Sequence, residues 1–590
     1  MRRSEYTVTV LGGFLIAMGV SSIASAQAQL SEARIQELIK QAAINVATAQ
    51  PTQTQSQAPG QARPVVQLTL EDAVKFALDR NLDIAVQRLN PQINDIAVAS
   101  IRTVYHPSLT SVFSGAGTTT PNSSSVAGSS VAGVPIITGA STFNGGIAQQ
   151  VPWGGGAFQV ALNNNRTTTT SLNTLFNPTY NTNWSGSYTQ PLLRNFRIDS
   201  TRQQLAVTRI NRDISDVQLR STITNTLSNV RSAYWDYVFA MQSVDVAKQS
   251  VDLAEQLVKD NQTRVEVGTM APIDVVQAQS QSATARQNLA VAAQTRDTAE
   301  LALKRLIVNG TQDANWNVQL DPVDRPDFRP EAIDVEAAVR RALSERTDVQ
   351  IARKTVEEND VTLRYLNDQL KPQLDFVGSY GLVGLGGAQY TYAADAGTGV
   401  NRQPNGSLPG GYNDALTSLF SGANPRWTAQ LNFSYPLGQS VQEASVARAR
   451  VQLSQISAQT KQIELQVATD VTNAAVTAKS NVDRVQAAQA ARELAQKQLE
   501  AEQSKFEVGM STNYNVIQSQ RDLATAQINE LQAVLNYRKS LVELERLQQT
   551  TLSSLNVTLL NAGGAAGNAL STTANTAANT VNTTTRPGGQ

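Results

Sequence analysis

The feature of this sequence that most constrains its fold is an internal duplication. The segment 264–277 reads RVEVGTMAPIDVVQ, and it returns 241 positions later, at 505–518, as KFEVGMSTNYNVIQ. Earlier in each copy, 68–78 (LTLEDAVKFAL) aligns with 333–343 (IDVEAAVRRAL) at an offset of 265, so the first copy carries a net insertion of 24 residues. A period this long exceeds that of a solenoid repeat and predicts two equivalent halves about a pseudo-symmetry axis.

The composition excludes several classes of function. Lysine plus arginine and aspartate plus glutamate each number 48, which provides no basic surface for nucleic acid. The chain has no cysteine, which excludes disulfides and thiolate chemistry, and its single histidine, His106, stands in a Tyr-His-Pro junction where we interpret it as structural. No glycine-rich phosphate loop follows a strand. We therefore expect no enzyme activity, no cofactor and no metal site.

The N-terminus resembles an export signal. Arg2 and Arg3 precede a short apolar run at 8–20, and Ala24-Ser-Ala26 is a small-residue cleavage site, so we predict a signal peptide over 1–26. The alternative, a membrane-anchor helix, is disfavoured because the apolar run is too short to span a hydrocarbon core of about 30 Å. No later segment supplies the roughly 20 apolar residues of a membrane-spanning helix, so a mature chain in a membrane must cross it as strands.

Two segments predict strands. Residues 108–190 and 373–435 are rich in glycine, serine, threonine and asparagine, and they contain short alternating runs such as LTSVF at 109–113 and WTAQLNFSY at 427–435. Alternation with aromatic residues near the ends is typical of membrane barrel strands. A soluble β-sandwich or disordered linkers are the alternatives, and the flanking helices favour the barrel.

Long helices flank these strand segments. Residues 197–262 contain neither glycine nor proline, and apolar residues recur there at a spacing of three to four. A second helix is predicted at about 272–307, and copy two repeats the pair at about 439–505 and 513–549. Two shorter helices are predicted before the first strands, from Thr69 and over 89–105. Prolines mark the junctions between helices and strands, at Pro107, Pro191, Pro372 and Pro436.

The chain so described cannot close on itself. Two strand pairs cannot form a barrel of about eight strands or more, and an open sheet edge in lipid costs several kcal/mol per unpaired group. Helices with small and polar faces on both sides, placed edge to edge, would form a hollow tube. We therefore expect copies of the chain to share one barrel.

Residues 67–550 resemble the TolC family of outer-membrane efflux and secretion channels. The resemblance rests on the Val-Gly turns at 267–268 and 508–509, on the Asp/Asn-Val-x-x-Ala/Ser-Gln pattern after them, and on the strand exits QPLLR at 190–194 and YPLG at 435–438. It implies a mixed α+β membrane protein: a homotrimer with a twelve-stranded transmembrane barrel, four strands per protomer, continuing into a periplasmic coiled-coil barrel. An equatorial belt would take 69–80, 309–332, 333–345 and the region after 550.

These boundaries divide the chain into segments. A signal peptide (1–26) precedes a flexible segment (27–66), a first repeat (67–308), a connector (309–332), a second repeat (333–550) and a low-complexity tail (551–590). We expect the 115–182 insertion to be an extracellular loop with its own hairpin. The other possibility is an extra strand pair in the wall, which would give eighteen strands in a trimer.

The resemblance implies a passive exit duct in the outer membrane of a Gram-negative-type cell. Such a duct serves a tripartite efflux pump or a type I secretion system. It is recruited by a periplasmic membrane-fusion adaptor and an inner-membrane pump of the RND, ABC or MFS type. The alternative is a trimeric coiled-coil surface adhesin or structural protein, which explains the helices but not the duplication.

The resemblance also implies two sets of site residues. Adaptor contacts would lie at the periplasmic turns, although glycine there is equally explained by the left-handed backbone of a tight turn. The entrance constriction follows the second turn. Asn515 and Gln518 stand where the family has pore-lining aspartates, and Ser511 stands where it has a base to pair with Asp274. We therefore expect an entrance gated by polar packing and Phe506, with little cation block. The turn set is Val267, Gly268, Thr269, Val508, Gly509 and Met510; the entrance set is Asp274, Phe506, Ser511, Asn515 and Gln518.

Overall fold

The computed structural model describes residues 64–122, 128, 133–325, 327–392, 404–438, 440–555 and 557. The chain separates into two units, residues 1–64 and 65–590, and every described helix and strand belongs to the second. The signal peptide predicted at 1–26 and most of the predicted tail lie outside the described residues. Among the helices of the described part, none is long and apolar enough to cross a membrane.

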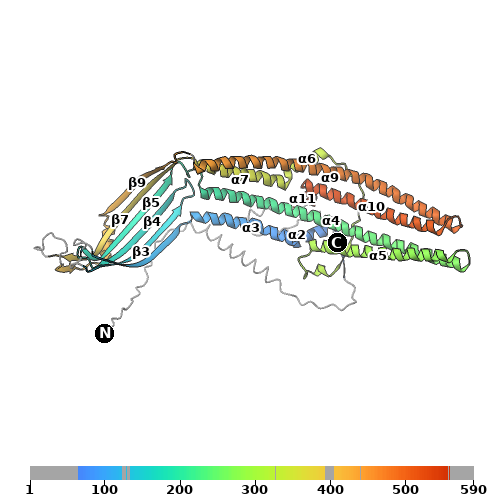
Figure 1. Cartoon of the computed structure of the whole chain (residues 1–590), viewed down its shortest axis with the longest axis horizontal. Helices are drawn as coiled ribbons and strands as arrows, with labels where there is room; N and C mark the ends of the chain where they lie inside the picture. Colours follow the sequence, from blue (N-terminus) through green and yellow to red (C-terminus); the bar gives the residue numbers. More distant parts are fainter. Residues whose placement is uncertain are drawn as a thin grey trace, which may run out of the picture. The chain divides into compact units, whose positions relative to one another are not determined.

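The duplication appears as two parallel series of elements (Figure 1). Each copy runs from a short helix through a second helix to strands, and then into a long helical hairpin. Copy one contains α2 (Leu70–Arg80), α3 (Leu82–Arg102), strands β2 to β5, α4 (Ser200–Glu266) and α5 (Pro272–Ile307). Copy two contains α6 (Val335–Glu345), α7 (Thr347–Gln369), strands β7 to β9, α9 (Val441–Glu507) and α10 (Asn513–Leu547).

Local capping sets the first helices. The hydroxyl of Thr69 accepts a hydrogen bond from the Asp72 amide, as the sequence predicts for a cap of α2. The next helix, α3, begins at Leu82 rather than at residue 89, because the Asn81 side chain accepts from the amides of Asp83 and Ile84 and caps it there. Pro91 lies inside α3 without ending it.

The strands form one antiparallel sheet. Its order is β2-β3-β4-β5-β7, with β9 on the far side of β7 and the short β8 pairing only the distal end of β7. A small 3-10 turn, η1 (Thr103–Tyr105), leads into the first strand. The bounds are β2 (Ser108–Thr120), β3 (Ile136–Gln150), β4 (Ala157–Thr169), β5 (Phe176–Pro191), β7 (Gln373–Thr391), β8 (Gly406–Leu408) and β9 (Pro425–Ser434).

The sheet corrects the expectation of four strands per protomer. The insertion at 115–182 is not an extracellular loop with a separate hairpin, because β3 and β4 lie in the sheet between β2 and β5. Thirteen consecutive residue pairs join β2 to β3, and the ladder continues through β4 into β5. The described part of the chain therefore contains six long strands, four in copy one and two in copy two.

A helix absent from the sequence-based prediction covers the distal end of the sheet. This helix, α8 (Tyr412–Phe420), packs on β7 at Gly384 and Gly386. A Cβ at Gly384 would lie 2.0 Å from the Ala415 carbonyl oxygen, so only glycine allows this approach. The Tyr412 hydroxyl donates to Asn164 on β4 (2.9 Å), which ties α8 to copy one as well.

Each long hairpin pairs a 67-residue helix, α4 or α9, with a helix about half that length. At 1.5 Å per residue, 67 residues extend for about 100 Å. In the half near the sheet α4 lies against α3 and α7, and towards the turns it lies against α5 and α10. The two copies therefore pack side by side along α4.

A belt of short elements crosses the middle of the helices. In it β1 (Val65–Leu68) pairs in parallel with β6 (Gln319–Pro322), and η2 (Ala314–Trp316) precedes β6. A buried ion pair, Lys304 to Glu300 at 2.7 Å, holds this loop, since Lys304 also donates to the Val318 carbonyl. Residues 551–554, placed in the tail by sequence, form the short helix α11 against α4.

Candidate functional site at the helical turns and the sheet

Each long hairpin turns through a glycine with a left-handed backbone. The φ angle is +79° at Gly268 and +77° at Gly509. In the first turn, the Gly268 amide donates to the Val265 carbonyl (3.0 Å) and the Thr269 amide donates to the Arg264 carbonyl (2.9 Å). Both bonds recur in the second turn, where residues 509 and 510 donate. This is the Schellman helix ending, which requires a left-handed residue and so explains both glycines.

The turns expose apolar side chains. Val267, Val508 and Met510 are 70%, 71% and 79% exposed. No atom lies within 4 Å of a Cβ built on either turn glycine, so each turn has free space beside it within the described chain. The end of each hairpin thus presents exposed apolar side chains.

The two turns are joined by one side chain. The Arg264 guanidinium lies 4.4 Å from the centroid of the Phe506 ring, and its Nη1 donates to the Phe506 carbonyl (3.1 Å). Phe506 is only 7% exposed and packs in an apolar cluster with Leu257, Met270 and others. The Phe506 ring therefore fills the space between the two hairpins, where it helps to hold them together.

A buried amide cluster lies next to this contact. The Asn261 amide donates to Asn513 Oδ1 (2.8 Å), and the Asn513 amide donates to the Asp274 carbonyl oxygen (3.2 Å). Three helices, α4, α10 and α5, thereby share one hydrogen-bonded group. In the described part of the chain, the Asp274 carboxylate forms no ion pair, and no hydrogen bond links Asp274 to Ser511.

Ser511 instead belongs to the second hairpin alone. Its hydroxyl donates to Glu502 Oε2 (2.7 Å), while Glu502 Oε1 accepts from Lys505 (2.7 Å). The Asn515 amide donates back to the Ser511 hydroxyl (3.3 Å). The hydrogen bonds from Lys505 and Ser511 hold the pKa of Glu502 below its ordinary value.

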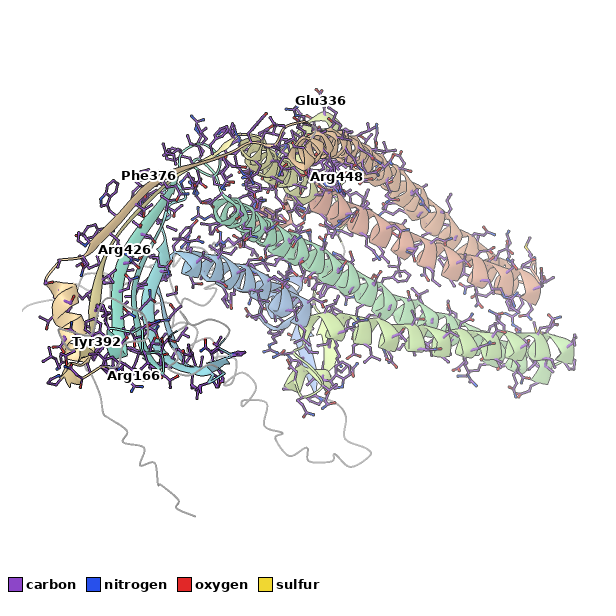
Figure 2. All side chains as sticks on the ribbon, turned by 60° about the vertical axis from the view of Figure 1, so that its left-hand side comes forward. Arg166, Glu336, Phe376, Tyr392, Arg426 and Arg448 are labelled. Carbon is purple, nitrogen blue, oxygen red and sulfur yellow. The ribbon has the colours of Figure 1, made fainter. Side chains whose placement is uncertain are left out.

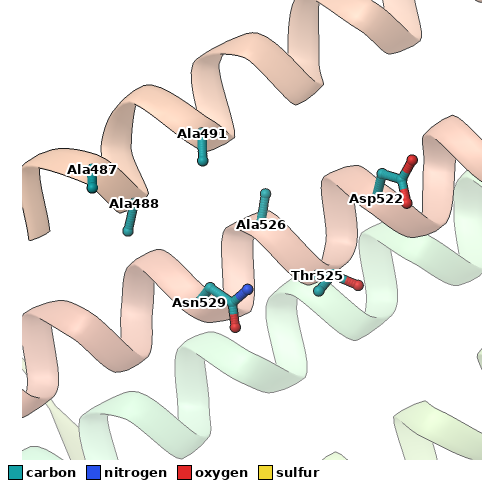
Figure 3. Close-up of a pocket in the computed structure, with 7 residues that line it drawn as sticks. All are labelled: Ala487, Ala488, Ala491, Asp522, Thr525, Ala526 and Asn529. Carbon is teal, nitrogen blue, oxygen red and sulfur yellow. The ribbon is translucent and has the colours of Figure 1, made fainter. Parts of the chain in front are cut away.

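One face of α10 carries a row of polar groups. Asn515, Gln518 and Asp522 follow at spacings of three and four, which places them on the same side of the helix. Gln518 is exposed and its amide donates to Asp522 (2.8 Å). Asp522 also borders an open groove between α9 and α10 whose other wall consists of Ala487, Ala488 and Ala491 (Figure 3).

Four polar residues of this site were not predicted from the sequence: Asn261, Asn513, Glu502 and Asp522. Only Asn261 carried a signal, since it continues the spacing of the apolar residues Val251, Ala254 and Leu257 along α4. The others depend on contacts between segments distant in sequence, or around a turn. Within the described residues, no three histidine or acidic side chains form a group that could hold a metal ion.

The sheet has one apolar and one polar face. Residues paired across the six long strands form rows. One row consists of Leu109, Ile147, Val160, Gly186, Tyr380 and Trp427. One residue further along, the row is Thr110, Gly146, Ala161, Ser185, Gly381 and Arg426. Phe376, labelled in Figure 2, belongs to the apolar face together with Phe113, Phe143, Phe158, Trp184, Leu431 and Phe433.

Solved structures share this fold. A membrane protein from Pseudomonas aeruginosa superposes with a TM-score of 0.58 at 15% identity, over 85% of this chain and 97% of that one. The CmeC outer membrane channel of Campylobacter jejuni gives 0.56 at 13% identity, over 83% and 90%. The MtrE outer membrane channel of Neisseria gonorrhoeae, in its open state, gives 0.55 at 15% identity, over 81% and 88%. These likenesses concern the fold.

The sequence agrees with the fold. A family model for outer membrane efflux proteins matches residues 157–309 and 338–548, which together make up more than half of the chain and include both long hairpins. The chain therefore belongs to the outer membrane efflux protein family, and the resemblance expected from its Val-Gly turns is confirmed. No curated protein sequence matches it.

Proposed function

We propose that this chain is the outer-membrane channel component of a tripartite efflux pump or a type I secretion system. Three copies share one transmembrane barrel in the outer membrane of a Gram-negative-type cell, and their helical hairpins form a tube in the periplasm. The observation that carries the proposal is the two-faced sheet, apolar on one side and polar on the other across six strands, joined directly to the long helices. The long strands have 10 to 19 residues, against about 9 to 11 needed to cross a bilayer.

The channel acts as a passive duct. Cargo enters from an inner-membrane pump of the RND, ABC or MFS type and leaves through the polar interior. A periplasmic membrane-fusion adaptor binds the hairpin ends, where Val267, Thr269, Val508 and Met510 present an exposed surface around the two turn glycines. Apolar side chains with free space around them suit such a helical partner.

The entrance is gated by contacts between the two hairpins. The Arg264–Phe506 contact and the hydrogen bond between Asn261 and Asn513 hold the two turns of one protomer together. Asn515 and Gln518 line the constriction, whereas Asp274 stays on the first hairpin, where its backbone carbonyl accepts from the Asn513 amide. Amides in place of carboxylates give a constriction with weak affinity for cations.

Conductance tests this function. The protein extracted in detergent is expected to migrate as a trimer and to form discrete ion-conducting channels in a planar bilayer. A trimer that never conducts, including after the Arg264→Met change that loosens the turns, would identify the protein as a structural stalk or adhesin.

Crosslinking tests the partner. Because the chain has no cysteine, Thr269→Cys introduces a unique thiol at the first turn. In cells, a thiol-reactive crosslinker is expected to join it to a periplasmic adaptor that mass spectrometry then identifies. Thr298→Cys, exposed but far along α5, is the matched control. Equal capture from both positions would contradict an adaptor site at the turns.

A further inference from the structure

The hairpin of β3 and β4 is a fixed part of the sheet. Its strands pair along 13 residues with each other, and β4 pairs with β5 over 11, from Ala157 to Thr167. The apolar and polar faces continue through the hairpin without a change of side, as the Leu109 and Thr110 rows show. A loop folded away from the wall would have no reason to keep this alternation.

The hairpin is also anchored at its helix-proximal turn, residues 151–156. The Gln190 amide donates to the Gly154 carbonyl (2.7 Å) at the end of β5, and the Gln149 amide donates to the Tyr105 carbonyl (2.9 Å) before β2. Gly155 sits against the start of α4, where its Cβ would lie 2.5 Å from the Asn195 carbonyl oxygen. The turn is therefore seated on both neighbouring strand–helix junctions.

The two edges of the six-strand sheet complement each other. Every residue of β2 and of β9 is exposed, and neither strand has a partner on its outer side among the described residues. β2 leads away from α3 while β9 leads back into α9, so the edges run in opposite directions. Both carry the apolar row on the same face, through Leu109 and Phe113 on β2 and through Trp427, Leu431 and Phe433 on β9.

We propose that β2 of one protomer pairs with β9 of the next. Each protomer then supplies six strands to the shared wall, and three protomers close an eighteen-stranded barrel. The inference rests on the proposed trimeric channel. Antiparallel pairing satisfies the backbone groups of both edges, which lipid cannot, and continues the apolar band around the outside.

An eighteen-stranded barrel is wide for the helices beneath it. Barrel diameter grows roughly linearly with strand number, so this wall is about one and a half times as wide as one of twelve strands. Among the described residues, four helices per protomer, α3, α4, α7 and α9, join the strands at the helical end of the sheet, while α8 lies at the distal end. In the described chain, no helix continues from the helix-proximal end of the β3–β4 hairpin, and the turn at 151–156 contacts the neighbouring strand–helix junctions there. The outer-membrane segment of the proposed trimer is thus wider than the wall that four strands per protomer would form.

Cysteine pairs test the strand order, since the native chain offers no competing thiol. Thr110→Cys on β2 is combined in turn with Thr428→Cys, Gln430→Cys and Asn432→Cys on β9, all on the polar face. Oxidation is expected to produce disulfide-linked dimers and trimers for the one or two pairs in register. Leu109→Cys with the same partners is the control, because it lies on the opposite face.

Two further cysteine pairs test the strand order within one protomer. Ala161→Cys with Ser185→Cys, which are register partners on β4 and β5, is expected to close an intrachain disulfide. Thr110→Cys with Ser185→Cys is not, because β3 and β4 lie between them. Closure of this last pair, or the absence of any bond between β2 and β9, would overturn the eighteen-stranded wall.

The native protein supplies an independent count. An electron cryomicroscopy map of the trimer is expected to show eighteen strands, and twelve would refute the proposal. Conductance of a trimer with twelve strands would leave the proposed function standing while removing this inference. Eighteen strands without conductance would do the reverse.

Discussion

The guanidinium of Arg264, on the first hairpin, lies 4.4 Å from the ring centroid of Phe506, on the second, and donates to the carbonyl of the same residue. The two residues stand 242 positions apart, at nearly equivalent places in the two copies: Arg264 corresponds to Lys505, the neighbour of Phe506. The duplication therefore does not give two equal turns. It gives one turn that provides a cation and one that provides the ring.

Removing this cation should loosen the entrance. A cation–π contact contributes about 0.5–2 kcal/mol and a hydrogen bond from a charged group about 1.5–3 kcal/mol, so Arg264→Met is expected to shift the closed–open balance by roughly tenfold or more. The measurement is the open probability of single channels in a bilayer. Arg286→Met is the control, because Arg286 pairs with Glu255 within the first hairpin. Similar gains from both variants would show that the effect is not specific to the joint between the hairpins.

Acid should loosen the second turn. Lys505 and Ser511 lower the pKa of Glu502, so the carboxylate stabilises the turn at pH values above the ordinary glutamate pKa. That contribution is lost as pH falls through the lowered pKa and the group is protonated. The mobility of a spin label attached at Met510→Cys is expected to rise in that acidic range, and Glu502→Gln is expected to remove the pH dependence.

A matched acid elsewhere provides the control for this pH effect. The pKa of Glu493 is also lowered, by its hydrogen bond with Lys497, but Glu493 lies earlier in α9, away from the turn. Glu493→Gln should leave the pH profile of the spin-label mobility at Met510 unchanged. A profile that is equally flat in both variants would assign the effect to general helix fraying.

The packing of the β3–β4 hairpin against the start of α4 should depend on Gly155. Its φ of +68° and the 2.5 Å approach to the Asn195 carbonyl oxygen leave no room for a methyl group. Gly155→Ala is expected to destabilise the fold by about 1–3 kcal/mol and to lower the yield of assembled trimers on a semi-denaturing gel. Gly145→Ala, in β3 with nothing within 4 Å of its Cβ and an ordinary φ, is the control and should assemble normally.

What the sequence predicted correctly was local. The 3–4 spacing, the glycine turns and the prolines are signals contained within each segment, and α5 spans the predicted 272–307 while α4, α9 and α10 end within a few residues of their predicted bounds. The insertion was misplaced because strand order is not local. Nothing within 136–169 states whether these strands pair with each other alone or also with β2 and β5.

The contacts around the proposed entrance were harder to predict for a related reason. Phe506 follows a lysine and precedes an acid in a helix of alternating polar residues, and its burial comes from the opposite hairpin. Asn513 looks like an ordinary residue at the start of a helix, yet it is buried against Asn261 of the other copy. Contacts between copy one and copy two, rather than patterns within either, determine which of these residues are buried.

Cation sensitivity should follow from the amides of α10. Asn515 and Gln518 present no carboxylate at the proposed constriction. The next acid on that face, Asp522, lies a turn further on and accepts a hydrogen bond from the Gln518 amide. Trivalent cations are therefore expected to block the wild-type channel only weakly, at concentrations well above the low-micromolar range. Asn515→Asp with Gln518→Asp is expected to lower the blocking concentration by at least tenfold, because the three protomers then bring six carboxylates together.

The duplication supplies the matched control for this last experiment. Gln277 on α5 occupies the position in copy one that Gln518 occupies in copy two, and Asp274 corresponds to Asn515. Gln277→Asp together with the native Asp274 creates the same pair of acids in copy one, and it is expected to leave the block weak. Strong block of the unmodified channel would show that Asp522 or Asp274 already forms a cation site. An equal gain from the Gln277→Asp variant would show that both copies line the constriction.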